Sequence, residues 1–273
     1  QTKMNQEEER QKYRAMLVEK KAKEQQIRLK ADAEQQLYDA SHTGDVSKVN
    51  DALNTEGVDV NKQDPQGRTP LMIASYNNHI AVVRLLLSKS DIDINKADDE
   101  GITALIIASF NGQVEVVQLL LSKSDIDINK AKDDGWTALI AASGGGHIEI
   151  VRLLLSRSDI DVNKGSAGHH RTTALYIASQ NNHIEVVRLL LSKSDIDINK
   201  ADDDGVTALI MASLRDHVGI VRLLLSNIDI DINKAATNGH TAISIAQEKG
   251  HTQIVQLLQQ HQNKEDRRQQ RIR

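Results

Sequence analysis

The chain has no cysteine, two prolines and few aromatic residues: one tryptophan, one phenylalanine and four tyrosines among 273 residues. Without cysteine no disulfide framework supports a secreted domain, which favours an intracellular, cytoplasmic protein. No apolar run approaches the roughly 20 residues of a membrane-spanning helix, which argues against such a span. The first residue is Gln1 and not methionine, which suggests a processed or trimmed product and leaves targeting open.

Motifs of common catalytic and metal sites are also missing. The chain contains neither a G-x-x-x-x-G-K-[S/T] phosphate loop nor an H-E-x-x-H zinc helix. Two H-I-E triplets, at 147–149 and 183–185, resemble the H-x-E of zinc deaminases, but that site requires cysteine ligands. The glycine-rich segments 144–146 and 165–168 lack the strand, lysine and helix start of a phosphate cradle. The sequence therefore predicts no catalytic residue, cofactor or metal.

What is present is a repeat. Leucine triplets begin at residues 85, 119, 153, 189 and 223, and each is followed by S-x-x-D-I-D and then by Asn-Lys. The asparagines that close these blocks lie at 61, 95, 129, 163, 199 and 233, so the spacings are 34, 34, 34, 36 and 34 residues. Self-similarity at this period indicates a stacked repeat protein and not a single globule.

The segment 98–131 illustrates one unit: a turn, a short helix, a tight link, a second helix and an extended segment. Thr103 stands where an N-cap hydroxyl accepts hydrogen bonds from the first free amides of a helix. Asn111-Gly112 ends that helix, because glycine tolerates left-handed backbone. The second helix begins near Val114 and is apolar on several faces. Each helix has about two or three turns, too few to persist alone in water, so neighbouring units have to cover it.

These residues resemble the ankyrin repeat family. The resemblance lies in G-x-T-A/P-L-x-x-A, in N/G-H/Q-x-x-V/I-V-x-L-L-L and in the D-I/V-N that leads to the next turn, over residues 31–262. It implies an all-α repeat solenoid, a stack of helix-turn-helix units with β-hairpin fingers, and a role in protein binding. The chain departs from the family pattern in the S-x-x-D-I-D link, which replaces the usual glycine after helix two.

The predicted organisation has three parts. A charged N-terminal helix covers 1–36, the repeat domain 37–262, and a basic tail 263–273. Within the repeat domain we expect the following units: an N-terminal cap at 37–63, full repeats at 64–97, 98–131, 132–167, 168–201 and 202–235, and a polar C-terminal cap at 236–262.

Five histidines recur at the start of helix two and suggest a metal ladder: His79, His147, His183, His217 and His251. Equivalent side chains on stacked helices lie about 8 to 10 Å apart, whereas two imidazoles on one zinc each approach it to about 2 Å. These residues therefore cannot share an ion. His169 and His170, in the longer finger, offer two ligands only, so a solvated loop is favoured over a weak metal site.

Charge is unevenly distributed. Residues 1–36 carry a net charge of +2 and residues 260–273 a net charge of +3, which leaves −9 on the repeat body. Much of this acid is the paired Asp of each link, for example Asp91 and Asp93. The pairs could bind a cation or steer a basic partner, although a solvated turn-forming edge, partly neutralised by the Lys after each Asn, is the favoured interpretation. An acidic body argues against nucleic acid as the main ligand.

The N-terminal segment lacks glycine and proline and is rich in strong helix formers, so it predicts one long helix. Its apolar residues do not sustain a heptad repeat, which argues against a self-sufficient coiled coil. A helix this polar either lies in solvent or docks on something outside the repeats. We expect it to dock on a neighbouring subunit.

By resemblance to the family, a protein partner is bound by the finger tips and by the exposed end of helix one, where the copies differ most. The only Trp and the only Phe both fall in this set, which favours a binding patch. Full burial of Trp136 by a partner would contribute up to about 4 to 6 kcal/mol, and the glycines at 144–146 leave a notch beside it. The predicted protein-binding residues are Arg68, Tyr76, Ile102, Phe110, Trp136, Gln180, Val206, Leu214 and Arg215.

Three functions remain open at this point. The first is a non-catalytic scaffold or adaptor, a subunit of a larger assembly, that binds another protein through this surface. The second is the targeting arm of an enzyme whose catalytic domain lies upstream of Gln1. The third is a structural element of a cytoskeletal complex, in which the N-terminal helix matters and the finger face does not.

Overall fold

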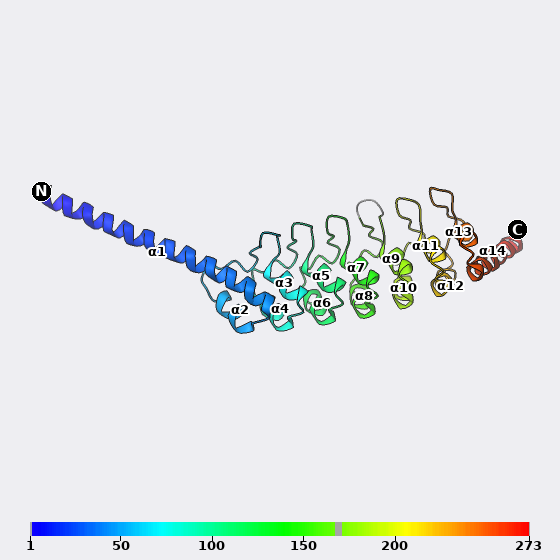
Figure 1. Ribbon diagram of the computed structural model, residues 1–273, viewed down its shortest axis with the longest axis horizontal. Helices are drawn as coiled ribbons and strands as arrows, with labels where there is room; N and C mark the ends of the chain where they lie inside the picture. The colour runs from blue at the N-terminus through cyan, green and yellow to red at the C-terminus, as the bar shows by residue number, and fades with distance from the viewer. Residues whose placement is uncertain (1, 167–170, 273) are drawn as a thin grey trace. The chain divides into compact units, whose positions relative to one another are not determined.

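The computed structural model of the chain describes residues 2–166 and 171–272. It divides into two compact units, Gln1–Asp93 (unit 1) and Ile94–Arg273 (unit 2), which are described separately. Figure 1 shows the helices of both units. All the regular elements in the described ranges are helices, as the repeat pattern predicts.

Unit 1 begins with one very long helix. α1 covers Thr2–Thr43 and is followed by α2 (Val46–Leu53), α3 (Pro70–Tyr76) and α4 (Ile80–Leu86). The helix does not end at residue 36 but continues through the first helix of the expected N-terminal cap. Nothing between 36 and 43 interrupts it, and Gly44, with a φ of +77°, follows its last residue.

The two halves of α1 have different surroundings. Residues 7–32 are exposed throughout, whereas Leu37 and Ala40 are buried where the helix packs against α2 and α3. The end of α1 thus covers the apolar face of the first repeat, as a capping helix does. The preceding turns extend beyond the packed part of unit 1 (Figure 1).

Unit 2 contains two rows of short helices. The first row consists of α5 (Ala104–Phe110), α7 (Ala138–Gly144), α9 (Ala174–Gln180), α11 (Ala208–Leu214) and α13 (Ala242–Lys249). The second row consists of α6 (Val114–Leu121), α8 (Ile148–Leu155), α10 (Ile184–Leu191), α12 (Val218–Leu224) and α14 (Thr252–Ile272). Within each row neighbouring helices pack side by side, and the fingers project beyond the first row (Figure 1).

The core of unit 2 lies between these rows. The middle leucine of each triplet is completely buried, as are the valine or isoleucine pairs that precede it: Leu120, Leu154, Leu190 and Leu224 are 0% exposed. Such contacts exist only between stacked helices, because each helix alone would leave this surface in water. The observed stacking thus confirms the repeat solenoid.

Local signals set the helix ends. The Thr103 hydroxyl accepts a hydrogen bond from the Ile106 amide at 3.3 Å, which confirms the predicted N-cap, and the corresponding threonines of the other repeats do the same. Gly112 follows the end of helix one with a φ of +74°. Asn182 and Asp216 adopt the same left-handed backbone at this position in later repeats.

The fingers are tighter than hairpins of paired strands. In the finger at 97–103 a single antiparallel bridge joins Ala97 to Thr103, and the Asp98 amide donates to the Ile102 carbonyl at 3.0 Å. No strand forms in the described residues, because only a few residues lie between the paired positions. The longer finger is closed by the Ser166 amide, which donates to the Thr172 carbonyl at 2.9 Å. His169 and His170, for which the sequence favours a solvated loop over a weak metal site, lie outside the described residues.

Two sets of hydrogen bonds link successive repeats. In the first, a histidine ring at the start of helix two reaches the backbone of the preceding repeat: His147 Nε2 lies 2.9 Å from the Phe110 carbonyl oxygen. Since a carbonyl only accepts, this nitrogen carries the proton and is not available to a metal. The same contact joins His79 to His42, His183 to Gly144, His217 to Gln180 and, through Nδ1, His251 to Ser213.

The second set involves the asparagine that closes each link. Asn129 Nδ2 donates to the Asp159 carbonyl at 2.6 Å, and Asn129 Oδ1 accepts from the Asp161 amide at 2.8 Å. Each Asn amide therefore holds the main chain of the next link at two points. We call this series the link ladder; it includes Asn61, Asn95, Asn129, Asn163 and Asn199.

The C-terminal segment is helical. α14 runs without interruption from Thr252 to Ile272, so residues 263–272 continue the cap helix and are not a separate tail. Residues 260–265, which are in register with the S-x-x-D-I-D links, have the sequence QHQNKE and remain in the helix. The chain at this point does not turn back as it does after the earlier repeats.

Candidate functional site

The predicted binding residues of unit 2 lie at the bases of the fingers and at the ends of the first-row helices, and not at the finger tips. Thr103, Thr137 and Thr207 start α5, α7 and α11, and the residue before each lies at the base of a finger. We call the resulting surface the finger face. Its predicted members are Ile102, Phe110, Trp136, Gln180, Val206, Leu214 and Arg215.

These side chains differ in exposure. Phe110, the last residue of α5, is 62% exposed, and Arg215 is also exposed. The other five are half-buried: Ile102, Trp136, Gln180, Val206 and Leu214. An exposed phenylalanine is the clearest apolar feature of this face, since most of its surface stays in contact with water in the described part of unit 2 unless a partner covers it.

Trp136 is partly covered by its own repeat. The atom Cζ3 of its ring would lie 3.9 Å from a Cβ placed on Gly144, so the ring rests beside the end of α7. Its main-chain amide donates to Asp134 Oδ1 at 3.1 Å, which fixes the finger that carries it. The tryptophan is thus less exposed than the sequence suggests. A partner can bury only the remaining area, so the contribution of Trp136 is below the value for full burial.

The expected notch beside Trp136 is filled. A Cβ on Gly145 would lie 2.4 Å from the His147 ring, and a Cβ on Gly146 would lie 2.6 Å from the His183 ring. Real Cβ atoms do not approach other atoms so closely, so these glycines make room for the histidines that join successive repeats. The three glycines therefore serve packing and leave no open notch.

The tips of the fingers are acidic. Asp99 and Glu100, Asp133 and Asp134, and Asp203 and Asp204 are all exposed. Two cations neutralise them in part: Lys132 Nζ lies 2.9 Å from Asp134, and Arg171 Nε lies 3.1 Å from Asp203. Neighbouring tips also join through the backbone, since the Asp133 amide donates to the Glu100 carbonyl at 2.9 Å. The exposed Phe110 thus belongs to a face with fixed, negatively charged fingers.

The predicted residues of unit 1 are Arg68 and Tyr76. Tyr76 is 63% exposed at the end of α3. Arg68 is half-buried and engaged within unit 1: Nη2 lies 2.7 Å from Asp64 Oδ2 and donates to the Tyr38 hydroxyl at 3.0 Å. Tyr38 in turn donates to Asp64 Oδ2 at 2.5 Å. A partner that binds Arg68 through its charge has to compete with this cluster.

Electrostatics show how tightly the cluster is coupled. Burial and the hydrogen bond to Asp64 raise the pKa of Tyr38 to about 12. Burial opposes ionisation of Asp64, but hydrogen bonds from Tyr38 and Arg68 outweigh it and lower the pKa of this carboxyl to about 2. Sequence reasoning missed Tyr38 and Asp64. The available signal was Asp64, which has the same place in its repeat as Asp98 and Asp202, where the carboxylate accepts finger amides.

A related contact occurs in unit 2. Tyr176 is buried in α9, and burial followed by the charge and hydrogen bond of Asp202 raises its pKa strongly. Asp202 belongs to the next finger and accepts the Val206 amide at 2.8 Å. This pair therefore connects one repeat to the finger of the next. Its role is structural, and it lies away from the exposed tips.

The described residues show no alternative chemistry. No three His, Cys, Asp or Glu side chains come together there as metal ligands would. Within the same ranges, no helix combines the length and apolarity required to cross a bilayer.

Comparison with known proteins identifies the fold family. A family description, ankyrin repeats in three copies, matches residues 37–132, 127–202, 164–236 and 194–270. The chain belongs to the ankyrin repeat family. This result confirms the resemblance seen in the sequence.

A solved ankyrin structure is similar over most of the chain. The ankyrin repeat domain of Bcl-3, described as a unique member of the IkappaB protein family, shares 25% identity with a TM-score of 0.72. The match covers 82% of this chain and 97% of the Bcl-3 chain. No curated protein matches the sequence. Ankyrin repeats are protein-interaction modules, so this chain is a protein-interaction repeat domain.

Proposed function

We propose that the chain is a non-catalytic ankyrin adaptor that binds a protein partner through the finger face of unit 2. The observation that carries the proposal is the combination of an exposed Phe110 with a half-buried Trp136 in a chain with few aromatic residues. Aromatic side chains that are partly covered and fixed by their surroundings are typical centres of binding energy in protein interfaces.

The negative charge of the finger face indicates which residues of the partner surround its contact with Phe110 and Trp136. Three fingers of unit 2 present exposed carboxylates in pairs, and only part of them is neutralised by Lys132 and Arg171. A partner with lysine or arginine around an apolar side chain would be attracted to such a face and oriented on it. Because these groups are at the rim and exposed, they influence association rate and salt dependence more than affinity.

A second contact is proposed for α1. Residues 7–32 of this helix are exposed and include Tyr13, Val18 and Ile27, which are more than 60% exposed. We infer that this part of α1 docks on a neighbouring subunit, so that the chain joins an assembly at one end and a partner at the finger face. The targeting arm of a larger enzyme and a cytoskeletal element remain alternatives.

The experiment uses cross-linking capture with the full chain and its Phe110→Ala variant, with bound proteins quantified by mass spectrometry. Phe110→Ala removes an aromatic side chain that is largely exposed, so the recovered amount of at least one captured protein is expected to fall about tenfold. Ile228→Ala is the matched control, since Ile228 is 82% exposed in a link away from the finger face. Equal recovery with both variants would reject the finger face.

The alternatives give other outcomes. Deletion of residues 2–30 is expected to abolish incorporation into an assembly while the finger face still captures its partner. A cytoskeletal element would depend on α1 alone: deletion of residues 2–30 would abolish incorporation, whereas Phe110→Ala would leave both incorporation and the set of captured proteins unchanged. A native polypeptide of about 30 kDa, the mass of this chain, would exclude the enzyme arm.

A further inference from the structure

The link ladder has an open end in unit 2. Four asparagines, Asn95, Asn129, Asn163 and Asn199, each bind the next link in the same way. In each case Nδ2 donates to the carbonyl of the first Asp, and Oδ1 accepts from the amide of the second. The distances are 2.6 and 2.8 Å for Asn199, which binds the link of residues 229–231.

Asn233 is the next asparagine in this series, but in the described part of the chain its side-chain amide binds no link. The register of the repeat assigns residues 260–265 to the following link, and these residues stay helical in α14. Their main-chain groups are therefore committed to the helix. Within the described part of the chain the Asn233 side chain has no hydrogen-bond partner, and it is exposed where its four counterparts are half-buried.

In unit 1, at the other end of the series, the first link is closed. Asp59 has the position of the second Asp in its link, and its amide donates to Glu34 Oε1 at 3.2 Å. Glu34 belongs to α1, so the capping helix supplies the acceptor that an asparagine supplies elsewhere. The end at Asn233 has no such substitute.

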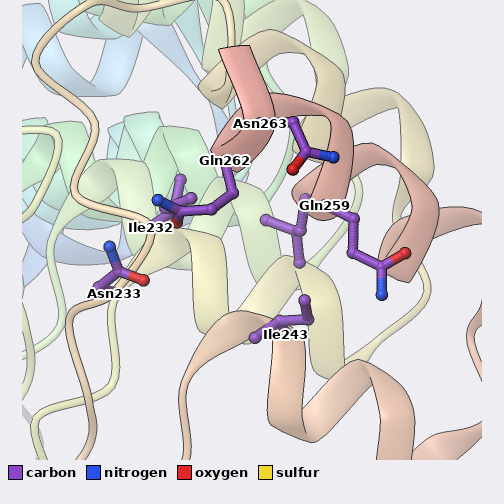
Figure 2. Close-up of a pocket in the computed structure, with 7 residues that line it drawn as sticks. Ile232, Asn233, Ile243, Gln259, Gln262 and Asn263 are labelled. Atoms are coloured by element: carbon purple, nitrogen blue, oxygen red, sulfur yellow. The ribbon is translucent and has the colours of Figure 1, made fainter. Parts of the chain in front are cut away.

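A pocket opens next to Asn233 because α14 does not turn back. It is lined by Ile232 and Asn233 from the last link, Ile243 from α13, and Leu258, Gln259, Gln262 and Asn263 from α14. Figure 2 shows α14 on one side and the link residues on the other, with Ile243 below. The two isoleucines form an apolar floor that suits an apolar side chain. The side-chain amides around them can hydrogen-bond to the main chain of a bound segment.

We propose that this open link site binds an extended segment of a partner protein with the pattern of the chain's own links, Asp-Ile/Val-Asp-Ile/Val. The carbonyl of the first Asp would accept from Asn233 Nδ2, and the amide of the second would donate to Asn233 Oδ1. The apolar residue that follows would enter the pocket at Ile232 and Ile243, because its counterparts Ile128, Val162 and Ile198 are buried in the interior links.

Charge near the site fits an acidic segment. Within α14, Lys264, Arg267 and Arg268 follow the residues that line the pocket, and Lys264 and Arg268 line the adjacent hollow beside Ile228. The only acidic residues in that stretch are Glu265 and Asp266. The stretch 264–268 thus carries one more basic than acidic side chain, which would offset part of the negative charge of Asp229 and Asp231 in the adjoining link when the segment binds. This site is separate from the finger face, so its test does not depend on the proposed function.

The test is a fluorescence anisotropy titration of the full chain with a labelled nine-residue peptide that repeats residues 192–200, Ser-Lys-Ser-Asp-Ile-Asp-Ile-Asn-Lys. We expect saturable binding that Asn233→Ala weakens at least tenfold. Since the Asn233 side chain is unpaired, this variant is expected to unfold at the same urea concentration as wild type. A peptide with the second isoleucine replaced by serine is expected to bind equally poorly.

Asn50→Ala, at an exposed position of α2, is the matched control and should leave peptide binding unchanged. Absence of saturable binding, or equal binding by the Asn233→Ala chain, would overturn the proposal. Self-association of the chain that Asn233→Ala abolishes, without peptide binding, would assign the site to a second copy and overturn the partner assignment.

Discussion

A buried serine without a hydrogen-bond partner recurs at one position of helix one. Each of these side chains is 0% exposed, and its hydroxyl has no partner in the described part of the chain: Ser41, Ser75, Ser109, Ser143, Ser179 and Ser213. A buried polar group that makes no hydrogen bond costs free energy. The small side chain is needed for close helix packing, but the hydroxyl is not.

We therefore expect Ser143→Ala to raise the free energy of unfolding by about 1 kcal/mol, because alanine removes the unpaired hydroxyl and favours the helix. The measurement is urea unfolding of the full chain followed by circular dichroism. Thr137→Ala on the same helix is the control and should lower stability by about 1 kcal/mol, since the Thr137 hydroxyl caps α7. A loss with both variants would mean that Ser143 has a partner.

The Tyr38–Asp64–Arg68 cluster predicts a dependence on pH. The pKa of Asp64 is about 2 in the fold against an ordinary value of 3.8, so ionisation favours the folded state. This contribution is complete above the ordinary value and is lost as pH falls from about 4 to about 2. Its size is about 1 to 2 kcal/mol, allowing for an Arg68 side chain that is 43% exposed.

The corresponding measurement compares urea unfolding of wild type and Asp64→Asn near neutral pH and at about pH 2. Asp64→Asn is expected to be the less stable protein at neutral pH, with the difference shrinking in acid. Tyr38→Phe removes two hydrogen bonds of the cluster, to Asp64 and from Arg68, but leaves the Asp64–Arg68 ion pair, so it should show a smaller loss of the same sign. A difference that stays constant across this range would disprove the coupling.

At the scale of elements, the sequence predicts most of what local signals decide. Threonine caps, glycines after helix one and the 34-residue period place the short helices, since each acts within a few residues of chain. The end of α1 is less well determined. The polar segment and the cap helix are both made of helix formers, so the pattern alone does not show that one helix joins them.

Other features depend on residues that are distant in sequence. The His147 and His183 rings take up the space at Gly145 and Gly146, and Tyr38 reaches Asp64 across 26 positions. Nothing local distinguishes a glycine that leaves a notch from one that admits a neighbouring ring. The exposure of Phe110 was predictable from its place at the end of helix one, but the partial burial of Trp136 required the packed finger.

On the scale of the whole molecule, each of the two units is a stack in which a repeat contacts its neighbours, so its stability depends on nearest-neighbour terms. The link ladder contributes such a term where the next link is present and none where it is absent. The two positions Asn163 and Asn233 have the same residue type and the same place in their repeats within unit 2. They differ only in whether a link follows in register.

This comparison isolates the contribution of the ladder. Asn163→Ala removes two hydrogen bonds, to the Asp195 carbonyl and from the Asp197 amide, and is expected to cost about 1 to 2 kcal/mol because water can partly replace them in an exposed link. Asn233→Ala removes none and should leave the free energy of unfolding within about 0.5 kcal/mol of wild type. Urea unfolding of both variants measures the difference. Equal losses at the two positions would show that the asparagine acts through its own turn, and the ladder would then have no part in joining the repeats.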